Sequence, residues 1–384
     1  MRTVLVTGPG GAGRTTVAAA TALAAARRGE RALLLTADRE DPTPRLFDGE
    51  EPPGLDVVRA DFRTELLALQ DRAGAALELL GAGRLDAEEL TELPGAEQLA
   101  LLKAVREAAA GGHDLVVVDM PPVHQSIAVL ALPGQLRRYL RRLLPPERQA
   151  ARSLRPVLAQ LAGVPMPARW LYETAARWDV ELAAVEAVVR DPATTVRLVA
   201  EPGAAGVAAL RAARLGLALH ELTTDAVIAN RVLPTGSADR FLAALSGHQQ
   251  CALKELAEEF EDVPLHEVPH LGREPEGPED LDELARGSGP WAGHAAAPAR
   301  AWHVEDRLAG DGVLVWHLPL PGARKDELGL VRRGDELLLT AGPFRRIAPL
   351  PSALRRCTVS GAGLTDGVLR IRFTPDPDLW PRTS

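Results

Sequence analysis

The stretch that decides the fold is Thr3-Val4-Leu5-Val6-Thr7-Gly8-Pro9-Gly10-Gly11-Ala12-Gly13-Arg14-Thr15-Thr16. Its apolar start predicts a buried strand over residues 2–7, and the Ala-rich residues 15–28 predict a helix that ends at Gly29. A second apolar run at residues 31–37 predicts another strand. Strand, glycine-rich loop, helix and strand in this order form a βαβ unit, which requires parallel strands.

Further apolar runs extend the sheet. We expect strands over residues 114–119, 195–200, 225–230 and 263–268, with helical stretches between most of them. Alternating strands and helices predict an α/β fold, in which helices cover both faces of a mostly parallel sheet. Helical spacing replaces this alternation at about residues 134–190. The insertion there is interpreted either as a helical cap that completes the core or as a lobe that binds a client or has a regulatory role.

The C-terminal part follows another pattern. Residues 289–301 are rich in Gly, Ala and Pro, which is typical of a linker. The apolar residues then alternate with a period of two, which predicts strands. They are Val313, Val315 and Leu318, then Leu337–Leu339, then Leu369, Ile371 and Phe373. We therefore expect an α/β domain over residues 1–288, a linker over 289–301 and a small all-β sandwich over 302–384.

Composition excludes several classes of protein. The net charge of −8 over 384 residues argues against a nucleic-acid binder, because such proteins carry basic surfaces. Two cysteines are too few for a disulfide scaffold or a four-cysteine zinc site within one chain. No apolar stretch approaches the ~18 residues typical of a membrane span, and no signal-peptide pattern precedes the first strand. We expect a cytoplasmic protein.

The loop between the first strand and helix matches the phosphate-binding pattern G-x-x-x-x-G-K-[ST], except that Arg14 replaces the lysine. Backbone N–H groups of such a loop converge on phosphate oxygens at a helix N-terminus. The fold class expected is therefore that of a P-loop NTPase. The candidate nucleotide-binding residues of the loop are Gly8, Gly10, Gly11, Ala12, Gly13, Arg14, Thr15 and Thr16.

Carboxylates at strand ends supply the remaining candidates. The hydroxyl of Thr15 has the position of a Mg²⁺ ligand, and Asp119, after the Val116–Val118 run, has the position of the carboxylate that holds Mg²⁺ through water. Asp38 follows the next strand after the loop and is the candidate catalytic residue that orients or deprotonates water. Asp38 and Asp119 both lie at the carboxyl ends of strands, where open α/β sheets bind ligands.

The combination resembles the family of arsenite-pump (ArsA) and tail-anchored-protein-targeting ATPases, whose deviant Walker A loop reads G-K-G-G-V-G-K-T-T. Asp38 falls on the first aspartate of the family's D-P-A-H segment, and residues 119–124 resemble its D-T-A-P-T-G switch. Residues 197–202 and 230–234 resemble its R-L-V-x-x-P and N-R-V-x-P segments. In the family, the asparagine of the N-R-V-x-P segment contacts adenine. This resemblance assigns Asn230 to nucleotide binding. Residues 303–375 resemble the α-crystallin-like (small heat-shock) domain found at the C-terminus of some members.

The departures from the family pattern lie at the site itself. Pro9 and Arg14 stand where the family has two lysines, one of which reaches across a dimer interface. Proline donates no hydrogen bond, and an arginine fork does not reproduce a compact ammonium. Asp41 replaces a histidine, and residues 123–125 replace threonine, glycine and histidine in the second switch. The zinc-binding C-x-x-C is missing, so we expect no zinc.

Two functions follow as hypotheses. The favoured one is a nucleotide-binding protein with weak or absent ATP hydrolysis, a pseudo-ATPase that regulates or scaffolds an active relative. The alternative is an active, dimeric, ATP-hydrolysing switch that binds a hydrophobic client or a peripheral membrane partner. An arsenite-pump subunit is disfavoured, because Cys251 and Cys357 fall in different expected domains.

The resemblance also implies partners and a cofactor. The expected ligand is Mg-ATP, bound weakly if at all. The expected assembly is a homodimer, or a heterodimer with an intact paralogue that carries the loop lysines, and no nucleic acid is expected. The C-terminal domain is interpreted either as a stabilising β-sandwich packed on the ATPase body, which we favour, or as a surface that holds unfolded clients.

Overall fold

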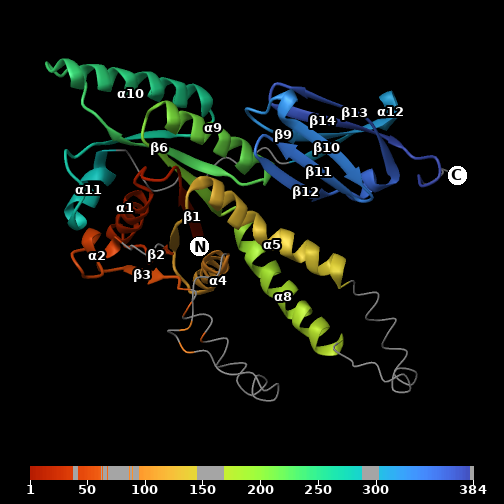
Figure 1. The fold of residues 1–384 in the computed structure, drawn as a ribbon, viewed down its shortest axis with the longest axis horizontal. Coiled ribbons are helices and arrows are strands. Elements are labelled where there is room, and N and C mark those ends of the chain that lie inside the picture. The colour runs from red at the N-terminus through yellow and green to blue at the C-terminus, as the bar shows by residue number, and fades with distance from the viewer. Residues whose placement is uncertain are drawn as a thin grey trace. The chain divides into compact units, whose positions relative to one another are not determined.

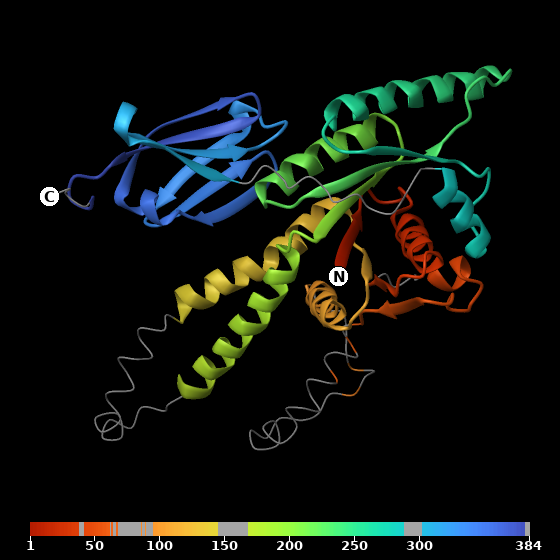
Figure 2. The same cartoon turned by 180° about the vertical axis from the view of Figure 1, so that it is seen from behind.

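A computed structural model describes residues 1–37, 42–61, 95–144, 168–287 and 302–380, together with the single residues 63, 67, 86 and 89. Contacts divide the chain into two compact units. The first comprises residues Met1–Val58, His113–Ile127 and Pro192–Ser384, and the second comprises Arg59–Gly112 and Ala128–Asp191. Figures 1 and 2 show the elements from opposite sides.

A parallel sheet of seven strands forms the centre of the first unit, as far as the structure describes the chain (Figure 1). Its order across the sheet is β3 (Leu55–Arg59), β2 (Ala32–Thr36), β4 (Leu115–Asp119), β1 (Arg2–Thr7), β5 (Thr194–Ala200), β6 (Thr224–Val232) and β7 (Leu265–Pro269). The predicted α/β fold is therefore confirmed. The strand β3 was not predicted, because only Leu55 of its five residues is buried.

The central strands are buried along nearly their whole length because both faces of the sheet are covered. Every residue of β2, β4 and β5 is buried. The helices of this unit, apart from α5, are α1 (Arg14–Arg27), α2 (Thr43–Leu46), α9 (Ala204–Leu219), α10 (Arg240–Glu259), α11 (Gly277–Gly287) and the short α12 (Leu308–Asp311). Alanines give α1 a slim face, and they pack with Val4 and Val6 of β1 and with Leu281 of α11 in one cluster.

A buried ion pair fastens α1, β5 and β6 together. The Arg197 guanidinium lies 2.9 Å from a carboxylate oxygen of Asp225 and donates to the Thr21 hydroxyl at 3.1 Å. Arg2 also pairs with Asp225 at 2.9 Å. The Arg197 side chain is fully enclosed, so it needs these acceptors to offset its desolvation. In this structure Arg197 acts as a structural residue.

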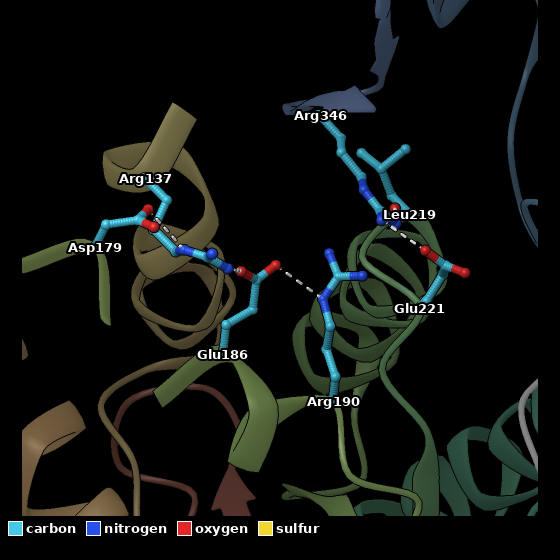
Figure 3. Close-up of polar contacts among 7 residues, drawn as sticks. All are labelled: Arg137, Asp179, Glu186, Arg190, Leu219, Glu221 and Arg346. Carbon is cyan, nitrogen blue, oxygen red and sulfur yellow. Dashed lines mark hydrogen bonds and ion pairs between the residues drawn. The ribbon is translucent and has the colours of Figure 1, made fainter. Parts of the chain in front are cut away.

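The second unit contains α4 (Ala96–Ala110), most of α5 (Val123–Leu143) and α8 (Ala168–Val189). Arg137 of α5 donates to Asp179 at 3.0 Å and to Glu186 at 2.7 Å on α8, and Glu186 also pairs with Arg190 at 3.2 Å (Figure 3). The helix α5 begins before the expected insertion and continues through Pro133. Residues 145–167, which belong to that insertion, lie outside the described residues, as does the expected linker 289–301.

Two antiparallel sheets form the C-terminal all-β region, as predicted. One has the order β10 (Leu328–Arg333), β11 (Glu336–Ala341) and β12 (Phe344–Pro349). The other has the order β13 (Cys357–Thr365), β14 (Val368–Pro375), β9 (Val313–Pro319) and β8 (His303–Arg307). Short 3₁₀ turns occupy Lys325–Glu327 and Ser352–Arg356. Along β9 the buried residues include Leu314 and Trp316, whereas Val313 at the start of the strand is only half-buried.

Candidate functional site

The glycine loop, residues Gly8–Thr16, joins β1 to α1 at the carboxyl edge of the sheet. Gly8 is buried against β5, where a Cβ atom would lie 1.9 Å from the Val199 carbonyl oxygen. Gly13 directly precedes α1 with a φ of 86°. Because glycine has no side chain, it offers no side-chain cap to the first N–H groups of the helix. The exposed Gly10 and Gly11 form the outer part of the loop. This arrangement leaves a helix N-terminus directed at an anion site.

Thr15 and Asp119 meet across the loop and the end of β4. The Thr15 hydroxyl donates to a carboxylate oxygen of Asp119 at 2.6 Å. Asp119 is buried, whereas Thr15 is half-buried. The sequence placed these two residues on either side of a Mg²⁺ site, and the structure brings their oxygens together. Hard oxygen donors of this kind are those that Mg²⁺ prefers.

Arg14 lies on the backbone of the segment that follows β4. Its guanidinium donates to the Met120 carbonyl oxygen in a short hydrogen bond. The Met120 N–H in turn donates to Val6 of β1 at 2.9 Å, and the Val123 N–H donates to Gly8 at 3.1 Å. Residues Asp119–Ser126, which we call the switch segment, are thus tied to the glycine loop at several points.

Two buried hydroxyls hold the middle of the switch segment. Thr7 and Ser126 lie 2.9 Å apart, and both donate to the Pro121 carbonyl oxygen, at 2.8 and 2.6 Å. Sequence analysis did not single out either residue. The only sequence signal was their position, since Thr7 directly precedes the glycine loop and Ser126 lies in the first turn of α5.

Asn230 and Arg231, at the end of β6, hold the glycine loop from the other side. The Asn230 amide donates to the Ala12 carbonyl at 2.9 Å, and it lies so close to Gly13 that a Cβ there would be 2.2 Å from its nitrogen. Arg231, at a φ of 59°, donates to the Gly11 carbonyl at 3.2 Å and pairs with Glu274 at 3.2 Å. Asn230 therefore positions the loop here, and its contact with a base stays a prediction.

The candidate catalytic residue, Asp38, lies outside the described residues, together with Asp41. The remaining candidates, Gly8 to Thr16, Asp119 and Asn230, converge within one unit on the loop and the adjoining strand ends. Arg231 is the main residue that the sequence analysis did not assign. Its place beside Asn230 in the segment compared with N-R-V-x-P was the available signal.

The chemistry of these donors fits a nucleotide with Mg²⁺. A glycine loop at a helix N-terminus and a guanidinium such as that of Arg14 are groups that bind phosphate in proteins, and an oxygen pair such as Thr15–Asp119 is of the kind that binds a hard cation. Among the residues that the structure describes, no three His, Cys, Asp or Glu side chains gather where they could hold a metal ion. The two cysteines are free, Cys251 exposed on α10 and Cys357 buried on β13.

The parallel sheet and the glycine loop define a P-loop nucleotide-binding fold. The family model described as anion-transporting ATPase (ArsA) matches residues 1–51 and 55–287, and the model of the HSP20-like domain found in ArsA matches residues 311–373. The chain belongs to the ArsA ATPase family. The resemblance inferred from the loop and switch motifs is thereby confirmed.

Relatives agree with this assignment along nearly the whole chain. An uncharacterized protein of Streptomyces coelicolor is 58% identical over the full length of both chains. A protein of Mycobacterium tuberculosis is 31% identical, with 99% of this chain and 97% of that protein covered. A protein of Aquifex aeolicus, whose name refers to an arsenical pump-driving ATPase, is 28% identical, with 92% of this chain and 95% of that protein covered. In the described part of the chain, no helix is long and apolar enough to cross a bilayer.

Proposed function

We propose that this chain is a nucleotide-binding pseudo-ATPase, a member of its family that binds Mg-ATP weakly and hydrolyses it slowly or not at all. The observation that carries the proposal is the state of the loop cations. Pro9 has no donor, and Arg14 donates to the Met120 carbonyl rather than projecting freely over the loop. The Met120 carbonyl holds one of the five N–H groups of this guanidinium, so drawing the arginine fully onto phosphate would cost that hydrogen bond, which lowers the net gain from binding.

Hydrolysis needs more than binding. When bound, Mg²⁺ would neutralise phosphate charge between Thr15 and Asp119. The loop residues would then have to stabilise the charge of the transferring phosphoryl group, which is the main protein contribution to this reaction. With one family lysine replaced by proline and the other by an engaged arginine, that stabilisation is reduced. Losing one such contact typically lowers the rate by about 10²–10³.

One observation favours the alternative, an active ATP-hydrolysing switch. Thr15 and Asp119 keep the paired oxygens of a Mg²⁺ site at 2.6 Å. Under this alternative the arginine would turn from Met120 to the phosphates, and the nucleotide would drive a dimer that binds a hydrophobic client or a membrane-associated partner. The two functions predict opposite results for turnover, and they agree on binding.

The pseudo-ATPase role implies a partner. Proteins of this family work as dimers, and in the resembled members one loop lysine reaches into the other subunit's site. A homodimer of this chain has no such lysine, because both loops carry Pro9. In a heterodimer with a lysine-bearing paralogue, the paralogue's lysine would reach the site built on Arg14. This chain would supply no lysine to the paralogue's site, because Pro9 stands at that position. We infer a regulatory or scaffolding subunit of such a pair; a paralogue whose ATPase rate ignores this chain would refute that role.

Calorimetric titration with Mg-ATP tests the binding part of the proposal. Wild-type protein should bind weakly, and the variant Pro9→Lys/Arg14→Lys should bind about tenfold or more tightly, because a charge-assisted hydrogen bond contributes about 1.5–3 kcal/mol. The matched control is Thr15→Val, which removes the hydroxyl at similar volume and should weaken binding only when Mg²⁺ is present. No heat of binding with either the wild type or the double variant would contradict the proposal.

A further inference from the structure

The switch segment touches the C-terminal β region at one aromatic contact. The imidazole of His124 stacks on the ring of Phe344, with centroids 5.6 Å apart and planes 15° from parallel. His124 is exposed and directly follows Val123, whose N–H donates to Gly8 of the glycine loop. Phe344 is buried at the start of β12. Two consecutive residues therefore make a backbone contact with the loop and a contact with the β region.

Phe344 is wedged against the elements that flank the switch segment. The Phe344 ring lies close to Gly216 of α9. A Cβ atom added to Gly216 would be 2.8 Å from this ring and 2.7 Å from the side chain of Ile127 near the start of α5. Gly216 is thus the small residue that admits both side chains. A shift of the first turn of α5 would press on Phe344, because close-packed groups cannot absorb a displacement freely.

Arg346 fixes the same strand to α9. It lies two residues beyond Phe344, on the same face of β12, and it is buried. Its guanidinium donates to the Leu219 carbonyl at 2.7 Å and to Glu221 at 2.6 Å, at the end of α9 (Figure 3), and it lies 4.3 Å from the ring centroid of Trp302. The β region is therefore anchored on α9, and Phe344 is where it meets the switch segment.

We propose that the C-terminal β region restrains the switch segment through the His124–Phe344 stack and thereby tunes nucleotide affinity. This coupling rests on the nucleotide-binding function proposed above. Under this proposal the stack supports the arrangement in which Arg14 donates to the Met120 carbonyl, and a guanidinium drawn fully onto phosphate would give up that hydrogen bond. Contacts that favour one arrangement of a switch weaken any ligand that requires the other. The coupling is reciprocal, so nucleotide loosens the stack.

The test measures Mg-ATP affinity by calorimetry in the full chain. His124→Ala removes an exposed ring and Phe344→Leu removes the stack while keeping an apolar side chain, so both should fold. We expect each to tighten binding about threefold to tenfold, the size of a typical coupling energy. Both substitutions remove the same interaction, the His124–Phe344 stack. The double variant should therefore bind Mg-ATP as tightly as either single variant. The control is the exposed Val331→Ala on β10, which should bind like wild type.

A second measurement does not depend on affinity. Amide hydrogen exchange along β12 should rise when nucleotide is added to wild-type protein, and it should not respond in His124→Ala. Wild-type binding with unchanged or weaker binding in both variants would overturn the coupling and leave the proposed function standing. Absence of nucleotide binding by the wild type would overturn the proposed function, and the coupling with it.

Discussion

At the residue scale, the site depends on where single groups donate and how closely backbones approach. The replacement of a loop lysine by Arg14 was visible in the sequence, but its hydrogen bond to Met120 was not, because a carbonyl over a hundred residues away supplies the acceptor. The same holds for the donation from Asn230 to Ala12. Motifs indicate which residue types approach a phosphate, whereas tertiary structure decides what else those residues bind.

Alanine substitutions at two loop glycines test whether the loop backbone must approach β5 closely. Gly8→Ala would place a Cβ 1.9 Å from the Val199 carbonyl, so loop or strand must move, and we expect the free energy of unfolding to fall by about 1–3 kcal/mol. Gly10→Ala is the matched control, because a Cβ there meets nothing within 4 Å and its φ lies outside the left-handed region. It should leave stability unchanged or raise it by up to about 1 kcal/mol in urea unfolding. Equal losses in the two variants would contradict this view of the loop.

At the element scale, periodicity predicted the buried strands and the first helix well. The run Leu115–Val118 is apolar throughout because both faces of β4 are covered, and Gly29 adopts a φ of 86° just after α1, as expected of a helix end. The edge strand β3 escaped prediction since solvent reaches most of its residues. The contact of α9 with β12 was also not predicted, because no local pattern reveals why α9 needs a glycine, Gly216, in its last turn.

Alanine substitutions at two helical glycines test the contact of α9 with β12. Alanine normally stabilises a helix interior relative to glycine by about 0.5–1 kcal/mol. Gly247→Ala on α10 should show this gain, because its Cβ would meet nothing within 4 Å. Gly216→Ala on α9 should instead cost about 1–2 kcal/mol, since its Cβ would be 2.8 Å from the Phe344 ring and 2.7 Å from Ile127. Thermal or urea unfolding of the two variants checks the prediction, which a stabilising Gly216→Ala would refute.

At the scale of the whole molecule, the chain combines a P-loop unit with an HSP20-like domain in one polypeptide. Sequence reasoning identified both parts from the glycine loop, the switch motifs and the change from helical to alternating periodicity. It could not foresee that Phe344 of the second part stacks on His124 of the switch segment. This contact is the basis of the proposed coupling between the β region and the switch segment.

Steady-state phosphate release by the purified chain at saturating Mg-ATP tests the central claim most directly. The account predicts a rate no higher than that of the Asp38→Asn variant, because the loop lacks both lysines of the resembled family and Arg14 is held by Met120. Phosphate release well above background in the wild type, abolished by Asp38→Asn, would contradict the account and establish an active ATPase.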